Sequence, residues 1–246
     1  MTTFATEELK LSAPPTPTYR AIAVLVGVFF IIGTAAGVAS GLVGNGVLGA
    51  TDVLAAAAAD ETSLIAAALL VLVMGFPLAM IPILLYPLFR RYNQILAMGA
   101  VLFRGVLEAV AYVGLAVLMF LTATVGRQYG AGADSQFEVW GATLLEAMDW
   151  VEVVLAIVFS LGAMILGWLF FRTRIIPRWL ALWGLIGAAF YFVAPLIVMF
   201  DIKGLELSLG TSMGWLLGPL AIQEMVFAVW VIVKGFEREG VRELMS

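Results

Sequence analysis

The stretch Ile95–Thr124, ILAMGAVLFRGVLEAVAYVGLAVLMFLTAT, is apolar over about 30 residues but carries two full charges near its middle, on Arg104 and Glu108. About 20 predominantly apolar residues are enough for a helix to cross a bilayer. Insertion scales put the cost of one charged residue at the centre of such a helix at roughly 2.5–3.5 kcal/mol. We therefore predict a membrane-spanning helix whose two charges require an explanation.

The whole chain is far more apolar than a soluble domain. Of its 246 residues, 63% are hydrophobic and 12% are charged, whereas soluble domains have about 45–50% and about 25%. The apolar residues form long blocks, which is typical of membrane proteins, so the lipid bilayer is the expected partner. The sequence contains no basic patch of the kind that binds nucleic acid.

The chain contains neither Cys nor His. Their absence excludes disulfides, thiolate nucleophiles, iron–sulfur clusters, His-ligated haem and hydrolases that use His as a base. Carboxylates, Arg, Lys, Tyr and hydroxyl groups remain for chemistry, and carboxylate ligation of a hard cation stays open. We assign no catalytic residue, no metal ligand and no cofactor.

Six apolar runs predict an all-α fold, a polytopic integral membrane helical bundle with six transmembrane helices. The expected helices cover about 21–43, 63–89, 95–124, 135–171, 179–200 and 213–233. We expect a single transmembrane domain at 21–236, between a flexible tail at 1–20 and a second tail at 237–246.

The basic residues outside the spans predict how the bundle is oriented. One side carries ten of the thirteen Lys and Arg residues, the other side carries Arg127 and Lys203, and Arg104 lies within the membrane. The positive-inside rule places the basic side and both termini in the cytoplasm, as an even number of spans also requires. We expect the cell membrane as the location. The ten residues are Lys10, Arg20, Arg90, Arg91, Arg172, Arg174, Arg178, Lys234, Arg238 and Arg242.

Local signals predict details of the first two spans. A stripe of glycines at four-residue spacing, Gly33, Gly37 and Gly41, is expected to let a neighbouring helix approach closely. Asp52 is expected to cap a short Ala-rich helix on the surface. The three prolines at 77, 82 and 87 predict bends in the second span.

Different signals apply to the middle of the chain. A polar loop is expected at 125–134, followed by a capping box of Ser135 and Glu138. The helical pattern that follows is about 54 Å long at 1.5 Å per residue, so its first turns should project beyond the membrane. This projecting part carries an acidic stripe, Glu146, Asp149 and Glu152, of which Glu152 is a candidate ligand-binding residue.

A charged cluster is expected near the middle of the membrane. Arg104 and Glu108 share one helix face at i, i+4 spacing, about 14 Å from the start of their span. Glu224 lies about 16 Å into the sixth span, which runs the opposite way. Since lipid does not solvate charge, all three should face the bundle interior. Tyr112 lies one turn beyond Glu108, whereas Gln223 points about 100° away from Glu224.

The predicted cluster has a surplus of negative charge. One Arg and two Glu residues, all ionised, carry a net charge of −1 in a place of low dielectric. We therefore expect a proton on one glutamate, with Glu224 the better candidate, or a cation that completes the cluster. The alternative is a purely structural network that locks two helices together, and a solvated helix face is the alternative for the acidic stripe.

Several phrases of the sequence resemble a known family. They are Leu102-Phe103-Arg104 with Glu108, Trp183-Gly184-Leu185-Ile186-Gly187, and Gln223-Glu224 followed by Lys234-Gly235-Phe236. They are similar to bacterial and archaeal six-span membrane proteins that are known as a domain of unknown function, family 4386. The resemblance covers about 19–236 and implies a membrane protein without an assigned activity.

Three classes of function fit these observations. The first is binding or transport of a small solute, cation or proton at Arg104, Glu108 and Glu224, with Tyr112, Gln223 and Glu152 as further candidate ligands. The second is a non-catalytic structural or regulatory membrane protein. The third, an intramembrane lipid-modifying enzyme, has no recognised motif, and we favour a protein that is not an enzyme.

Overall fold

A computed structural model describes residues 17–132, 135–200 and 214–245 of the chain. Within these ranges every regular element is a helix, which confirms the predicted all-α bundle. The elements are α1 (Pro17–Leu48), α2 (Val53–Ala59), α3 (Glu61–Tyr92), α4 (Gln94–Ala100), the π-helical segment η1 (Val101–Leu107), α5 (Glu108–Ala131), α6 (Ser135–Thr173), α7 (Arg178–Met199), α8 (Gly214–Val233) and α9 (Arg238–Met245).

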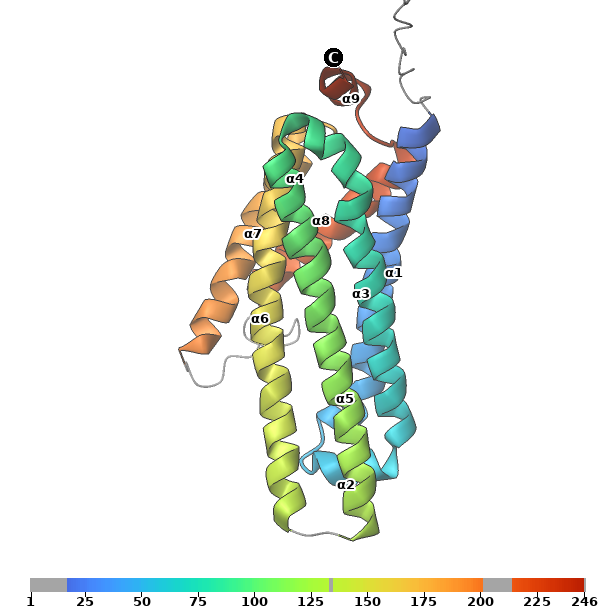
Figure 1. The fold of residues 1–246 in the computed structure, drawn as a ribbon, viewed down its shortest axis with the longest axis vertical. Helices are drawn as coiled ribbons and strands as arrows, with labels where there is room; N and C mark the ends of the chain where they lie inside the picture. The colour runs from blue at the N-terminus through green and yellow to red at the C-terminus, as the bar shows by residue number, and fades with distance from the viewer. Residues whose placement is uncertain (1–16, 133–134, 201–213, 246) are drawn as a thin grey trace, which may run out of the picture.

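The helices form one elongated bundle (Figure 1). α1, α3, α5 and α6 run along most of its length, while α7 leans away from α6 and ends well above the ends of α5 and α6. α2 closes one end of the bundle, which we call the α2 end, and α4 and α9 lie at the other. The sequence predicts that the first turns of α6 project beyond the membrane, and in the structure these turns extend past the end of α7.

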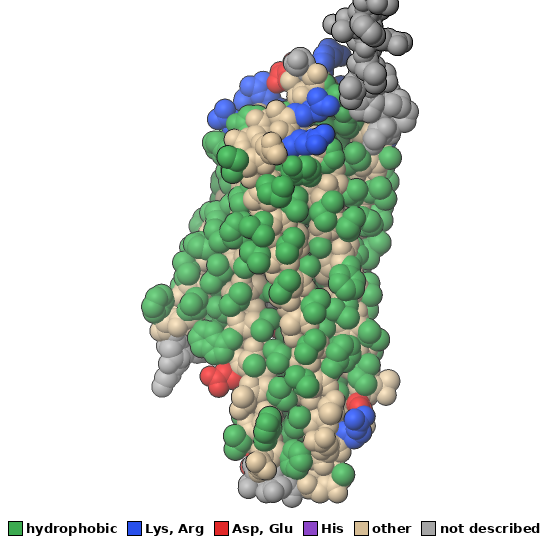
Figure 2. All heavy atoms as spheres, viewed as in Figure 1, with side chains coloured by type: hydrophobic (Ala, Val, Ile, Leu, Met, Phe, Trp, Pro, Cys, Tyr) green, Lys and Arg blue, Asp and Glu red, His purple; other side chains and the backbone are tan. Residues whose placement is uncertain are grey.

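The surface fits a chain that crosses a membrane several times. Five helical segments are long and apolar enough to do so, and α8 and α9, bent by 81° to each other, count as a sixth if taken together. Hydrophobic side chains cover the middle of the molecule, and Lys and Arg side chains gather at the end that carries α9 (Figure 2). We call this the basic end. These long apolar helices agree with the multi-pass membrane protein predicted from the sequence.

Small residues allow α1 to pack closely against α3. A Cβ atom added to Gly33 would lie 2.6 Å from the Leu78 side chain, and one added to Gly37 would lie 2.6 Å from the Met74 sulfur. A Cβ atom added to Gly41 would meet no atom within 4 Å. Two of the three predicted stripe positions therefore make close helix contacts, and α3 continues without a break through its three prolines.

The predicted Asp52 cap is confirmed, but one predicted loop is mostly helical. The Asp52 carboxylate accepts a 2.9 Å hydrogen bond from the Ala55 amide at the start of α2. The predicted loop at 125–134 is wrong over most of its length, because α5 continues to Ala131. Its last turns pack against α2, where a Cβ on Gly126 would lie 2.6 Å from the Ala57 Cβ. This tertiary contact extends the helix.

Both ends of the described chain are also more ordered than the sequence suggested. α1 begins at Pro17, inside the predicted flexible tail, the rest of which lies outside the described residues. The tail at 237–246 contains α9, whose Gly240 packs so tightly that a Cβ there would lie 2.5 Å from the Arg174 carbonyl oxygen. The Glu237 amide also donates a 2.8 Å hydrogen bond to the Ile175 carbonyl. The segment between the fifth and sixth predicted helices, 201–212, lies outside the described residues.

Candidate functional site: a buried charged triad

Arg104 lies in the π-helical segment between α4 and α5, in the first third of the long rod that α4, η1 and α5 form. Such segments are rare and occur frequently at functional sites. A Cβ atom on Gly162 of α6 would lie only 2.7 Å from the Arg104 backbone nitrogen. On α3, Pro82 and the Ala79 carbonyl would each lie 3.4 Å from a Cβ on Gly105. Glycines at positions 105 and 162 thus allow η1 to pack closely against two helices.

The predicted cluster of Arg104, Glu108 and Glu224 forms in the structure. Arg104 Nη1 donates to Glu108 Oε1, and Arg104 Nη2 donates to Glu224 Oε1 at 2.8 Å. Arg104 and Glu108 are 2% and 1% exposed, and Glu224 is 18% exposed. We call these three residues the triad. The triad joins the rod to α8.

Two aromatic rings cover the rest of the Arg104 guanidinium group. Its central carbon lies 4.1 Å from the centroid of the Phe159 ring on α6 and 5.9 Å from that of Phe30 on α1. Cation–π contacts of this kind stabilise a desolvated cation by up to about 2 kcal/mol. Arg104 is therefore held by its own rod, α1, α6 and α8, with two carboxylates as its ionic partners.

The hydrogen bonds of the triad leave one buried acceptor unused. Among the described residues, Glu108 Oε2 is buried and has no hydrogen-bond partner. Tyr112, one turn further along α5, is 7% exposed, and its side chain interacts directly with the Glu108 carboxylate group. Because an unsatisfied buried acceptor costs about 1–3 kcal/mol, and more when it is charged, this oxygen is a natural position for a proton, a water molecule or a cation.

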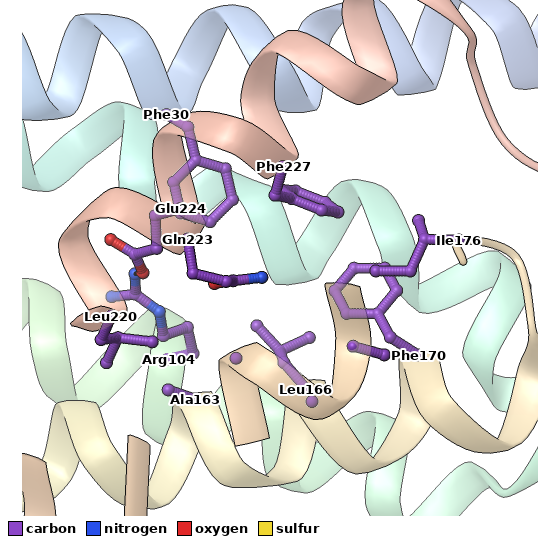
Figure 3. Close-up of a pocket in the computed structure, with 13 residues that line it drawn as sticks. Phe30, Arg104, Ala163, Leu166, Phe170, Ile176, Leu220, Gln223, Glu224 and Phe227 are labelled. Atoms are coloured by element: carbon purple, nitrogen blue, oxygen red, sulfur yellow. Dashed lines mark hydrogen bonds and ion pairs between the residues drawn. The ribbon is translucent and has the colours of Figure 1, made fainter. Parts of the chain in front are cut away.

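A narrow cavity of about 40 Å³ lies beside the Arg104–Glu224 pair. Figure 3 shows Arg104, Glu224 and Gln223 at one end of the cavity, with Phe170 and Ile176 at the other. Since one water molecule needs about 10–15 Å³ of such volume, the cavity accommodates about three or four waters or a small ion. It extends from the triad toward Ile176, in the link between α6 and α7 at the basic end.

Gln223 lines this cavity although it does not contact the triad. Its side-chain amide donates a 3.1 Å hydrogen bond to the Leu180 carbonyl of α7. A Cβ on Gly184 would lie 2.9 Å from the Gln223 side-chain nitrogen, so this glycine provides the space for the amide. Gln223 places a polar group on the α7 side of the cavity.

The acidic stripe of α6 is separate from the triad. Glu152 precedes Phe159 by seven residues, is exposed, and has Asp149 as an electrostatic neighbour. Of the six predicted site residues, the structure thus brings Arg104, Glu108 and Glu224 into direct contact and places Tyr112 and Gln223 beside them. Glu152 lies farther along the bundle. Among the described residues, no group of three or more acidic, His or Cys side chains could hold a metal ion.

Three aromatic residues around the triad were not predicted from the sequence. Phe30 and Phe159 contact Arg104, and the Tyr191 ring packs edge-on against Phe159 with 5.1 Å between centroids. Each belongs to a different apolar helix, α1, α6 or α7. Aromatic residues are frequent in apolar spans, so only the packing of the helices distinguishes these three.

A family model described as "Domain of unknown function (DUF4386)" matches residues 25–235. The match includes the triad and every residue that lines the cavity. No curated protein and no solved structure matches the chain.

Proposed function

Since the chain belongs to the family described as domain of unknown function 4386, we propose that it is a membrane protein that binds and translocates a proton or a small monovalent cation. The binding site is the triad of Arg104, Glu108 and Glu224. We also propose that it lies in the cell membrane, with the basic end and both termini on the cytoplasmic side. The gathering of basic residues at one end supports this orientation.

The observation that carries this proposal is the unbalanced charge of a buried site that still has an unused acceptor. Two carboxylates share one guanidinium group, and Glu108 Oε2 has no hydrogen-bond partner among the described residues. A closed ion pair would need nothing more, whereas this arrangement is neutralised by one added positive charge. The cavity of about 40 Å³ limits the ligand to something small.

The proposal is tested with Glu224→Gln in liposomes. Glutamine preserves the size of the side chain and an oxygen that can accept from Arg104, but it removes the surplus charge. We expect the variant to lose the uptake of one proton or cation per chain, and its flux to fall to that of empty liposomes. Flux is followed with a pH-sensitive dye for protons and with ion-sensitive dyes for sodium and potassium.

Glu61→Gln is the matched control, because Glu61 forms an ion pair with Arg127 at the α2 end, far from the triad. This control should retain the binding and flux of the unmodified chain. Unchanged binding and flux in Glu224→Gln would overturn the proposal.

A structural lock is the second candidate function, and the contacts of Arg104 with α1, α6 and α8 favour it. If the triad only holds helices together, exchanging the two charges, as in Arg104→Glu with Glu224→Arg, should restore folding that either single change loses. A well-folded Glu224→Gln variant without flux would contradict this second candidate. The comparison separates loss of stability from loss of transport.

A further inference from the structure

Tyr191 of α7 brings a hydroxyl-bearing ring to the aromatic residues around the triad. Its ring contacts Phe159, and Phe159 in turn contacts the Arg104 guanidinium group. Tyr191 is within electrostatic reach of Glu108, Glu224 and Arg104. One aromatic ring therefore separates the Tyr191 ring from the centre of the triad.

Glu152 continues this series toward the α2 end. Seven residues correspond to two helical turns, so Glu152 lies on the same face of α6 as Phe159, about 10 Å farther from the basic end. Arg104 itself is about 15 Å along the rod from its start at Gln94. Glu152 is thus about 25 Å into a hydrocarbon core of about 30 Å, near its far boundary, where an exposed carboxylate can reach water.

The groups that face Tyr191 come from several helices. Glu152 of α6, Glu108 and Arg104 of the rod, and Glu224 of α8 all interact with it electrostatically. Tyr112 of α5 is a further electrostatic neighbour of Tyr191, and its ring packs into the space left by Gly75 of α3. Tyr191 is thus within electrostatic reach of protonatable groups on both the triad side and the Glu152 side.

We propose that the ligand of the triad is a proton and that Glu152 and Tyr191 carry it between the α2 end and the triad. This inference rests on the proposed function. In the transfer step, the Tyr191 hydroxyl releases its proton toward a triad carboxylate and accepts another from protonated Glu152. The tyrosine is regenerated, Glu152 becomes a carboxylate, and one proton has moved. Bridging water molecules complete the links.

The cavity supplies the second half of the path. The cavity begins at the Arg104–Glu224 pair and extends toward Ile176 at the basic end, and the polar side chain of Gln223 lines its wall. Water in this space carries a proton between the triad and the cytoplasmic side. A metal cation cannot pass by exchange through a tyrosine hydroxyl, so the inference excludes sodium and potassium as the translocated species.

Tyr191→Phe tests the inference, because it removes the hydroxyl and keeps the ring that packs on Phe159. We expect proton flux in liposomes to fall about 100-fold, within the range that a positioned proton-transfer group contributes. Equilibrium proton uptake by the triad should not change. Tyr129→Phe is the matched control, because Tyr129 lies near the end of α5 beside Asp52, and its flux should equal that of the unmodified chain.

Glu152→Gln is the second test and should lower proton flux to a similar extent without loss of proton uptake. The inference is overturned if both Tyr191→Phe and Glu152→Gln transport protons at the unmodified rate, or if sodium or potassium flux replaces proton flux. Full flux in these two variants combined with loss of flux in Glu224→Gln would refute the path alone. Unchanged flux in Glu224→Gln as well would refute the proposed function.

Discussion

Two ion pairs of nearly equal length lie in opposite environments, one buried and one exposed to solvent. Arg104 and Glu224 are joined at 2.8 Å inside the bundle, and Arg127 and Glu61 are joined at 2.9 Å at the α2 end. The arginine is 2% exposed in the first pair and 63% exposed in the second. Solvent screens the second pair, whereas the first is surrounded by helices. The distance between charges therefore says little about what an ion pair contributes.

The two pairs also differ in how their charges balance. Arg127 and Glu61 neutralise each other, so the surface pair is closed. Arg104 serves two carboxylates at once, which leaves the buried site one negative charge in excess. Only the buried site therefore has an electrostatic reason to bind something else.

Removing the arginine of each pair should produce the largest difference in stability between the two sites. Arg104→Met leaves two buried carboxylates without a cation, and removing one partner of a buried ion pair costs about 3–5 kcal/mol. Arg127→Met should change the free energy of unfolding by less than about 1 kcal/mol, as is usual for exposed pairs. Thermal and denaturant unfolding in detergent micelles measures both. Equal losses in the two variants would refute the distinction.

A smaller effect is expected where α6 meets the π-helical segment. Gly162→Ala adds a Cβ atom 2.7 Å from the Arg104 nitrogen, which η1 can avoid only by moving away from α6. Overpacking of this kind costs about 1–3 kcal/mol. The shift should also lower the affinity of the triad for its ligand.

The control for this change is Gly41→Ala, because a Cβ at Gly41 meets no atom within 4 Å. Alanine in an open helical position stabilises a protein by about 0.4–1 kcal/mol. The two changes should therefore shift the unfolding temperature in opposite directions. A stabilised Gly162→Ala variant would contradict the close packing of η1 and α6.

The smallest effect concerns the surface pair and its response to salt. Glu61→Gln should lower the free energy of unfolding by less than about 1 kcal/mol. This loss should disappear at about 1 M salt, where the screening length is about 3 Å. The effect of Arg104→Met should persist at the same salt concentration. Unfolding measured at low and high salt checks both expectations, and a loss in Glu61→Gln that resists salt would place that pair in a less exposed setting.

The triad could be predicted from the sequence because helix periodicity and helix rise fix the relative positions of its members. Arg104 and Glu108 are four residues apart, so any helix brings them to one face. Glu224 was added by counting depth from the ends of two antiparallel spans. The rise and the periodicity of a helix are enough to predict that the three residues meet, and the two ion pairs confirm this prediction.

The parts that sequence reasoning missed depend on how helices pack. The π-helical segment arises where Gly162 lets α6 approach Arg104, and no hydrophobic periodicity indicates it. Phe159 and Tyr191 are recognisable only from the packing of α6 against the rod and of α7 against α6. The extension of α5 to Ala131 likewise depends on a contact with α2.

The separation of Arg104 and Glu224 by 120 positions along the chain has a consequence for membrane insertion. If helices enter the bilayer in the order of synthesis, the rod arrives with Arg104 and Glu108 as a neutral pair, which lowers the cost of inserting it. Glu224 enters with α8, when the guanidinium group is already in place to receive it. The excess negative charge is therefore created only when the last long helix docks, so an incomplete bundle lacks the charge on which the proposed function depends.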